Sequence, residues 1–480
     1  FPVILLTALF YVIFGISDFA SSLPALVITI SILIIVFKLL KGHGPKVLII
    51  GLSMCTFSNW FIFYSDKLMP DIYVALAVIW ALAVIHRYKY KSDRRHTLWH
   101  AFLLALSLLF GFMSKGTIVL VLPLIFYLVI IDIILKRDLK FWAYSLLNGL
   151  ILMSLYLGLI WMLTGNPFER FDAIAGNAYL NLCSYDQQST RILLRRIFLG
   201  FFELTIFQSL ATGFIFVFAS LVQRKGLGIF RINDSHAFFS ASALILFLSS
   251  SFMSISLGSY APMCLDPRHY LFLVPVVAIP ASRNIVDFLE QRKSAFPIVA
   301  ILMGVSVISY FLEGNSFWKL YVPLTALFAL FHFIGTPRTS WLFILLFSLI
   351  LLLLPLEMIQ YAGQVQYRMQ RSLLKEEVLL RHPDATIVTN EVQKRLLQYY
   401  TGFHEDHSQR FISYEEYEAD PEGKGDLLLL QNGHTRYLSG MDQNDLPVWA
   451  REIPAEIQAL FRSKKPHMVL YDMRDLPLVH

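Results

Sequence analysis

The sequence predicts a polytopic membrane domain built only of helices, followed by a small water-soluble α/β domain. Hydrophobic residues make up 56% of the chain and charged residues only 15%, whereas a typical soluble domain has roughly 45–50% apolar and about 25% charged residues. The apolar residues are also grouped into runs that short polar or basic segments separate. A run of about 20 apolar residues crosses the hydrocarbon core, and backbone groups in lipid need internal partners, so these runs should be helices.

The runs divide the chain into a membrane domain, residues 1–361, and a C-terminal domain, residues 362–480. A shorter apolar stretch, residues 2–15, is expected to lie at the membrane interface. The predicted spans, about twelve in number, are residues 22–40, 47–64, 71–86, 98–112, 116–135, 142–163, 199–222, 236–256, 269–287, 296–312, 319–334 and 341–361.

Positive charge orients these spans in the membrane. The cations concentrate in alternate loops, at residues 38–46, 87–95, 136–140, 224–231, 292–293 and 338, which the positive-inside rule places in the cytoplasm. The opposite loops, and with them residues 362–480, are then external. This pattern accounts for the net charge of +6, so we expect no nucleic-acid partner.

The C-terminal domain changes in character. Residues 364–382 and 391–403 have helical patterns, and residues 385–390, 426–432 and 467–473 are short apolar segments typical of buried strands. Alternating strands and helices predict a small α/β layer domain. The sequence contains three cysteines without a CxxC pair or a His/Cys cluster, which argues against a structural zinc site. Cys183 and Cys264 both fall in predicted external loops, where the environment is oxidising, so we expect that they can form a disulfide.

Two polar clusters flank the early spans on the external side. The first, residues 64–71, contains Asp66 and Asp71; a carboxylate there could hold a metal, orient a lysine or accept a proton. The alternative is a solvated turn before a helix that begins at Pro70. The second is Lys115 within an apolar run. Its ammonium could bind a phosphate or simply reach the lipid headgroups.

Two further clusters lie in later external loops. The loop 165–191 contains Glu169 and Asp172 among aromatic residues, a composition that suits sugar binding or a structured lid. The segment 265–280 contains Arg268, His269 and Tyr270 beside Asp266. The arginine suits bidentate phosphate recognition, although arginine and tyrosine also anchor helices at the interface.

All four clusters are predicted on one side of the membrane, which suits a substrate with a phosphate head and a lipid tail, such as a polyprenyl-phosphate-linked sugar. An alternative is a transporter or flippase of a lipid-linked saccharide. That class predicts charges at mid-membrane depth and repeat symmetry, and the sequence has no evident repeat. A non-catalytic membrane scaffold would leave the four clusters unexplained.

Four segments carry a family resemblance, which covers most of residues 1–290. They are FPVILLTALFYVIFGISDFASSLPALV at 1–27, YSDKLMPDIYVALAVIWAL at 64–82, GFMSKGTIVLVLP at 111–123 and DPRHYLFLVPVVAIPAS at 266–282. Their order and spacing resemble the dolichyl-phosphate-mannose–protein mannosyltransferase superfamily. This superfamily includes the bacterial aminoarabinose and related polyprenyl-phosphate-dependent transferases of the GT-C fold. One departure is His269, which is inserted before Tyr270.

The resemblance implies a glycosyltransferase of the bacterial inner membrane that transfers a sugar on the external face. The donor would be a polyprenyl-phosphate sugar, and the acceptor a lipid, glycan or protein. Lys115 and Arg268 would lie near the donor phosphate, and Asp71 near the reacting centre. Some members of the family bind a divalent metal, which this sequence neither requires nor excludes.

The resembling family also has an acidic pair in its first external loop, upstream of the matching segments. The present sequence starts at Phe1, beyond that position. We therefore expect a first span and its loop to precede Phe1 and to supply the catalytic base, with Asp71 assisting. On this expectation, residues 1–480 alone would not catalyse transfer.

Overall fold

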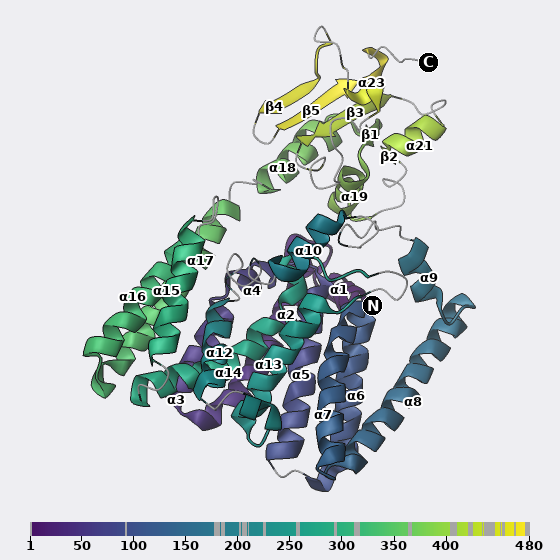
Figure 1. Cartoon of the computed structure of the whole chain (residues 1–480). Helices are drawn as coiled ribbons and strands as arrows, with labels where there is room; N and C mark the ends of the chain where they lie inside the picture. The colour runs from purple at the N-terminus through teal and green to yellow at the C-terminus, as the bar shows by residue number, and fades with distance from the viewer. Residues whose placement is uncertain are drawn as a thin grey trace. The chain divides into compact units, whose positions relative to one another are not determined.

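In the computed structural model the chain forms two compact units, Phe1–Met358 and Ile359–His480 (Figure 1). The residues that the structure describes are all but 1, 92–93, 177–182, 184–187, 201–202, 204–208, 210, 224–226, 256–259, 292–294, 312–316, 363–366, 404–409, 421–425, 434, 436–446, 452, 454–456, 465–466 and 476–480.

The regular secondary structure of the first unit is helical in its described part, apart from one isolated bridge between Ser254 and Pro262. Its α-helices are α1 (Pro2–Phe14), α2 (Asp18–Leu40), α3 (Pro45–Thr56), α4 (Asn59–Tyr64), α5 (Pro70–Tyr90), α6 (Thr97–Ser114), α7 (Leu122–Ile134), α8 (Leu139–Thr164), α9 (Glu169–Gly176), α10 (Thr190–Phe198), α12 (Ala211–Gln223), α13 (Ser235–Phe252), α14 (Leu273–Gln291), α15 (Ala295–Phe311), α16 (Trp318–Ile334) and α17 (Ser340–Ala362). Its short 3₁₀ helices include η1 (Lys41–His43), η2 (Arg94–His96), η3 (Gly116–Val121), η5 (Pro267–Tyr270) and η6 (Pro337–Thr339).

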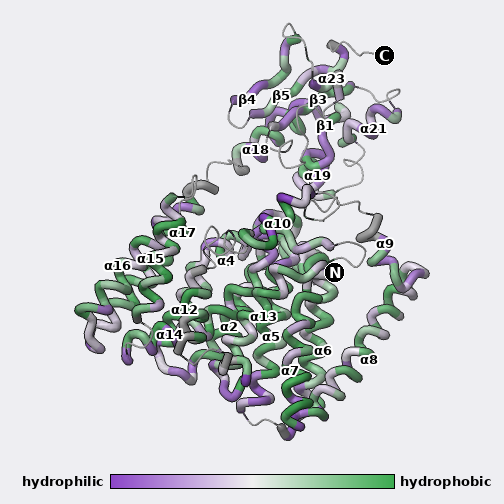
Figure 2. The backbone as a smooth tube through the Cα atoms, viewed as in Figure 1, coloured by the Kyte–Doolittle hydropathy of each residue, from purple (hydrophilic) through white to green (hydrophobic). Residues whose placement is uncertain are grey.

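Among the described residues, 7 helices are long and apolar enough to cross a membrane, and shorter apolar helices accompany them. Every predicted span contains helix within its described residues. The chain is a multi-pass membrane protein in which hydrophobic residues dominate the helices (Figure 2). The predicted span 47–64 is wrong as one continuous helix. It is broken between α3 and α4, where Ser58 adopts an extended backbone conformation. For the predicted span 199–222, the described helix is α12, which begins at Ala211.

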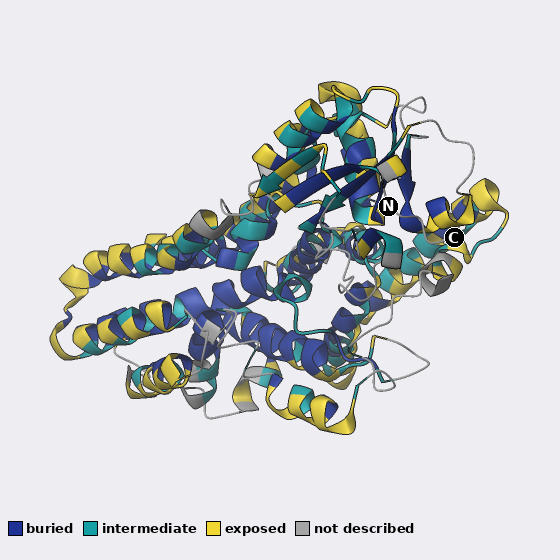
Figure 3. Cartoon of the chain, turned by 90° about the horizontal axis from the view of Figure 1, so that it is seen from above, coloured by how far each residue is buried: buried dark blue, intermediate teal, exposed yellow. Residues whose placement is uncertain are grey.

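Burial distinguishes central from peripheral helices in this unit. The most apolar window of α5 is 83% buried, whereas that of α8 is only 11% buried. Large exposed apolar side chains on α8 include Leu155, Trp161 and Met162, as expected for a surface that faces lipid. Figure 3 shows the same contrast between buried and exposed helices. The helix α5 is therefore a central element, and both of its ends are held by neighbours.

One buried carboxylate connects three of these helices. Asp132 of α7 has no exposed surface and pairs with Lys89 of α5. Its Oδ1 accepts a hydrogen bond from Arg137 Nε at 2.8 Å, and its Oδ2 accepts one from Trp142 Nε1 of α8 at 2.7 Å. Charges are costly in an apolar interior unless they are paired, and here the cations and the indole supply the partners.

The second unit is the α/β domain that the sequence predicts. Its strands are β1 (Thr386–Thr389), β2 (Phe411–Ser413), β3 (Leu427–Asn432), β4 (Phe461–Lys464) and β5 (His467–Asp472), in the order β2-β1-β3-β5-β4. The strand β1 is parallel to both β2 and β3, while β5 is antiparallel to β3 and β4.

Helices cover both faces of this sheet. Leu374 and Val378 of the π-helix Leu374–Leu379, which follows α18 (Tyr367–Leu373), and Leu397 of α19 (Glu391–Tyr400) pack in one apolar cluster. Tyr417 of α21 (Tyr414–Ala419) and Ala450 of α23 (Val448–Arg451) belong to a second cluster. Alternate residues of β3 enter the two clusters, Leu429 the second and Leu428 and Leu430 the first, as the two-residue repeat of a strand requires.

Candidate functional site

Three of the sequence-predicted site residues meet at one end of α5. Lys115 Nζ lies 2.6 Å from Asp71 Oδ1, and His269 Nδ1 lies 3.0 Å from the same oxygen. Lys115 Nζ and His269 Nδ1 are 2.8 Å apart. The Asp71 side chain is only 4% exposed, while that of Lys115 is 23% exposed. The cluster therefore holds a shielded carboxylate and a cation that solvent or a ligand can still reach.

Local sequence explains how each group reaches this position. Pro70 is the first residue of α5 and places Asp71 in its first turn, where proline is favoured and a carboxylate interacts well with the helix dipole. Lys115 is the C-terminal cap of α6, with an extended backbone (φ −158°, ψ 140°) that turns the chain into η3. His269 belongs to η5, whose first amide is capped because Arg268 N donates to Asp266 Oδ1 at 3.0 Å.

The contacts of His269 depend on its proton. If Nδ1 carries a proton, it donates to Asp71 Oδ1; if it does not, it accepts a hydrogen bond from the Lys115 ammonium. One nitrogen cannot do both, although both distances permit bonding. The position of one proton therefore decides whether Asp71 is bonded by the imidazole or by the ammonium alone.

Arg268 is the second cation of the site segment. Its Nε lies 3.0 Å from Asp266 Oδ2, and the two side chains are 37% and 36% exposed. The pair is open enough for its guanidinium to exchange a partner, and guanidinium is well matched to phosphate. Arg268 directly precedes His269 in η5. Its partly exposed guanidinium is therefore next in sequence to a residue of the Asp71 cluster.

Tyr270 has a different environment from the other predicted residues, because its side chain is completely buried. Its hydroxyl lies 3.1 Å from Arg196 Nη2 of α10. Arg196 also donates from Nη1 to the carbonyl oxygen of Ser251 at 3.3 Å and from Nη2 to that of Met263. Arg196 was not predicted, and it joins α10, the end of α13 and η5. The observed role of Tyr270 is to anchor the site segment.

The remaining predicted carboxylates are exposed and lie in other contacts. Asp66 Oδ1 pairs with Lys67 at 2.7 Å, and Asp172 Oδ2 accepts a hydrogen bond from Asn166 at 2.7 Å. Glu169 is exposed at the start of α9. Within the described ranges, none of these three contacts Asp71. Most of the loop 165–191 beyond residue 176 lies outside the described residues.

The predicted pairing of Cys183 with Cys264 is confirmed, with Cα atoms 5.5 Å apart. The disulfide connects the loop 165–191 to the segment just before Asp266. A cavity of about 400 Å³ lies beside it, lined in part by Arg196 and Leu265. The disulfide and Arg196 therefore both fasten the segment that carries Arg268 and His269.

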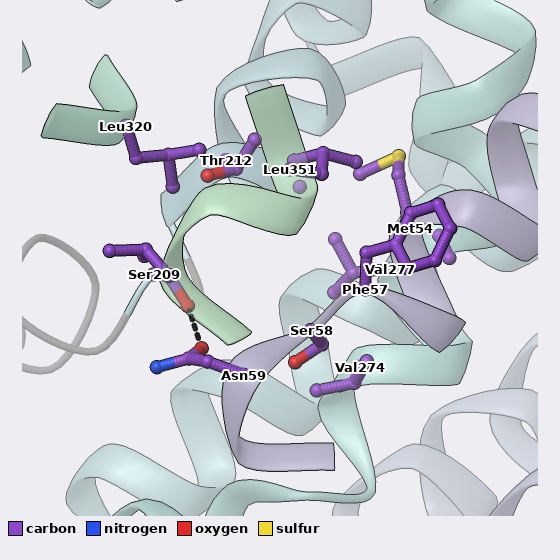
Figure 4. A pocket seen from close by; sticks show the side chains of 13 residues that line it. Met54, Phe57, Ser58, Asn59, Ser209, Thr212, Val274, Val277, Leu320 and Leu351 are labelled. Atoms are coloured by element: carbon purple, nitrogen blue, oxygen red, sulfur yellow. Dashed lines mark hydrogen bonds between the residues drawn. The ribbon is translucent and has the colours of Figure 1, made fainter. Parts of the chain in front are cut away.

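A separate, small cavity of about 50 Å³ lies where the span 47–64 is broken. It is mostly apolar, with Leu320 and Leu351 among its lining residues (Figure 4). Ser209 donates to Asn59 Oδ1 at 2.6 Å at its edge, as Figure 4 shows. None of the Asp71 cluster lines it, so this cavity is not the candidate site.

In the described part of the chain, no group of three or more His, Cys, Asp or Glu side chains is arranged to hold a metal ion. Within the cluster, Asp71 Oδ1 already contacts both Lys115 and His269.

Comparisons with known proteins relate this architecture to solved structures. No family model matches the chain, and no curated protein sequence matches it. The structure of ArnT from Cupriavidus metallidurans bound to undecaprenyl phosphate aligns with a TM-score of 0.57 and 13% identity, covering 98% of this chain and 86% of that one. The apo structure of the same protein aligns with a TM-score of 0.52 over the same shares, also at 13% identity. The chain therefore has the fold of the ArnT structures, the GT-C-type architecture that the sequence resemblance implied.

Proposed function

We propose that this protein transfers a sugar from a polyprenyl-phosphate donor to a lipid, glycan or protein acceptor at the external face of a bacterial inner membrane. The observation that carries the proposal is the meeting of Asp71, Lys115 and His269 at the ends of two apolar helices. The ArnT fold supports it, because one of those structures is bound to undecaprenyl phosphate.

The proposed reaction needs particular charged groups at the donor phosphate and at the acceptor. An acceptor oxygen or nitrogen attacks the anomeric carbon of the donor sugar, and the bond from that carbon to the phosphate oxygen breaks. The electron pair of that bond stays on the departing polyprenyl phosphate, and the acceptor's proton passes to a base. Catalysis thus needs cations at the leaving phosphate and a carboxylate or imidazole at the acceptor.

The cations of the site suit the phosphate. Lys115 is partly exposed although it contacts Asp71, and Arg268 is more exposed still. Lys115 lies at the junction of α6 and η3, and Arg268 lies in η5. The contacts of Asp71 with Lys115 and with His269 of η5 connect these two segments. In the proposed complex, the Lys115 ammonium and the Arg268 guanidinium bind the donor phosphate, which matches the charge-assisted bonds that such groups form.

Asp71 has the role of a positioning and proton-accepting carboxylate in this proposal. Its Oδ1 aims the Lys115 ammonium, and His269 offers a second route for a proton. Asp66 is the alternative catalytic carboxylate, exposed and only paired with Lys67. Glu169, Asp172 and the residues around them would contribute to sugar or acceptor binding through the loop that the disulfide secures.

The proposal also includes an orientation of the chain in the membrane. The charge pattern of the loops places Asp71, Lys115 and residues 362–480 outside the cytoplasm. The membrane lipid beside α6, which is less buried than α5, would hold the polyprenyl tail, and the α/β domain would face the external compartment.

A transfer assay tests the proposal. Residues 1–480 and a version extended upstream of Phe1 are each reconstituted with a radiolabelled polyprenyl-phosphate sugar and crude membrane acceptor, and label in the acceptor is counted. In the form that transfers the sugar, Asp71→Asn should lower transfer by about a hundredfold or more, in the range typical for loss of acid–base catalysis. Glu357→Gln, which changes an exposed carboxylate paired with Lys319, should retain activity. Donor binding with vectorial movement of the saccharide but no transfer would instead support the transporter.

A further inference from the structure

A large cavity lies at the opposite ends of the two helices that carry Asp71 and Lys115. Its volume is about 790 Å³, within the range of about 300–1,000 Å³ that ligand sites usually have. It is formed by the C-terminal end of α2, the C-terminal end of α5 and the N-terminal end of α6. Its lining combines basic side chains with apolar ones.

The polar part of the lining is strongly basic. Lys38, Lys41, Arg87 and Lys91 contribute cations, and His86, His96 and His100 add imidazoles. No Asp or Glu lines it among the residues that the structure describes, which leave out 92 and 93. The positive-inside rule accounts for cations in these loops, but not for their convergence from α2, η1 and the C-terminal end of α5 on one cavity.

Two further observations indicate an anionic ligand. The α6 helix begins at Thr97, and its cap residue His96 makes no side-chain capping hydrogen bond. Because His96 and Trp99 line the cavity, the positive end of this helix adjoins it. His86 is 3% exposed, and its Nε2 bonds to Ser235 Oγ at 2.8 Å. Its Nδ1 is buried without a hydrogen-bond partner in the described structure. A buried polar atom of this kind normally has a partner, and His86 is one of the residues that line the cavity.

The apolar part of the lining identifies the ligand as an amphiphile. Ile35, Leu39, Trp80, Trp99 and Leu103 line the same cavity as the cations. Trp99 is 57% exposed, and the neighbouring apolar side chains of Leu98, Ile34 and Phe37 are 58%, 48% and 43% exposed. A small soluble phosphate would use only the basic half. A phospholipid would use both, with its headgroup phosphate on the cations and its acyl chains along these helices.

We infer that this cavity binds the headgroup of an anionic phospholipid on the membrane face opposite the candidate catalytic site. About 16 residues of α5 separate Asp71 from Arg87, which corresponds to about 24 Å along the helix, so the two sites cannot share one ligand headgroup. The bound lipid would stabilise the packing of α2, α5 and α6. The inference does not depend on the reaction proposed above.

Lipid retention by the full chain in neutral detergent, measured by native mass spectrometry, tests the inference. The probes are phosphatidylglycerol, phosphatidylcholine with the same acyl chains, and inorganic phosphate. Phosphatidylglycerol should bind saturably and about tenfold or more tightly than phosphatidylcholine. Inorganic phosphate at the same concentration should not displace it.

Paired charge variants locate the binding. The variant Lys38→Gln/Lys91→Gln removes two exposed cations of the cavity and should weaken phosphatidylglycerol binding by about tenfold. The variant Lys136→Gln/Lys140→Gln removes two exposed cations of a neighbouring basic loop and should leave binding unchanged. Leu103→Trp, which fills the cavity without changing charge, should also weaken binding.

Three results would overturn the inference. Equal loss in the two charge variants would indicate general attraction to the surface rather than a site. Equal retention of the anionic and zwitterionic lipids would show that the cations do not recognise the headgroup. Full displacement by inorganic phosphate would identify a site for a soluble phosphate instead of a lipid.

Discussion

The Lys115 ammonium lies 2.6 Å from the Asp71 carboxylate across 44 positions of sequence. The pair joins the start of α5 to the end of α6 and exposes the lysine more than the aspartate. The pair therefore connects two helices, and it places a partly exposed ammonium beside a buried carboxylate.

Removal of one member of this pair should cost stability as well as activity. Asp71→Asn or Lys115→Met alone leaves a largely buried charge without its partner, a change that costs about 3–5 kcal/mol at fully buried sites, and the partial exposure of Lys115 favours the lower end. The double variant should lose less than the sum of the two single losses. Unfolding in detergent measures all three variants, and strictly additive losses would show that the pair does not interact in the folded protein.

The buried Asp132 should be among the most sensitive positions for folding. Asp132→Leu leaves Lys89, whose side chain is 3% exposed, without its close partner, and frees the Trp142 indole from its hydrogen bond. We expect a loss of about 3–5 kcal/mol in the free energy of unfolding. The control Glu357→Gln removes an exposed ion pair and should cost about 0–1 kcal/mol. Similar unfolding of the two variants would contradict the buried network.

Thiol counting checks the disulfide between Cys183 and Cys264. The denatured, unreduced protein should take up one thiol reagent at Cys55, the free cysteine among the three, and reduction should expose the other two. Mass spectrometry reads the number of adducts directly. An identical adduct count before and after reduction would rule the bond out.

The orientation of the chain follows from the cationic loops and predicts an external C-terminus. A fluorescent reporter that matures only in the cytoplasm, fused after His480, should stay dark in intact cells, while a periplasmic phosphatase fused there should be active. A bright reporter at this position would invert the assigned topology, and with it the side on which Lys115 and Arg268 meet a donor.

Composition and periodicity were sufficient to predict the two-part fold. The apolar runs of α5 and α8 need no tertiary information to be recognised as spans, and the apolar strands β1, β3 and β5 are similarly clear. By contrast, β2 has three residues, and β4 is the polar edge segment Phe461–Lys464. Segments this short or this polar carry little strand signal, and only their pairing with neighbours defines them.

The site could be predicted residue by residue but not as a cluster. Asp71, Lys115 and His269 were each identified by a charge or imidazole at a membrane face, yet their contacts join three distant segments. Arg196 was missed because α10 is a strongly amphipathic helix whose arginines look like a solvated face. Its actual partners are main-chain carbonyl oxygens and Tyr270. Asp132 could have been found, since a carboxylate within an apolar run is itself an indication of a buried partner.

Binding of a polyprenyl phosphate tests the central claim most directly. Its dissociation constant is measured for the wild type, Arg268→Ala, Lys115→Ala and the control Arg338→Ala, which changes an exposed arginine of η6 in a basic loop. Each site variant should lose a charge-assisted hydrogen bond of about 1.5–3 kcal/mol, hence roughly tenfold or more in affinity, and Arg338→Ala should bind as the wild type does. Unchanged affinity in both Arg268→Ala and Lys115→Ala would contradict the assignment of these cations to the donor phosphate.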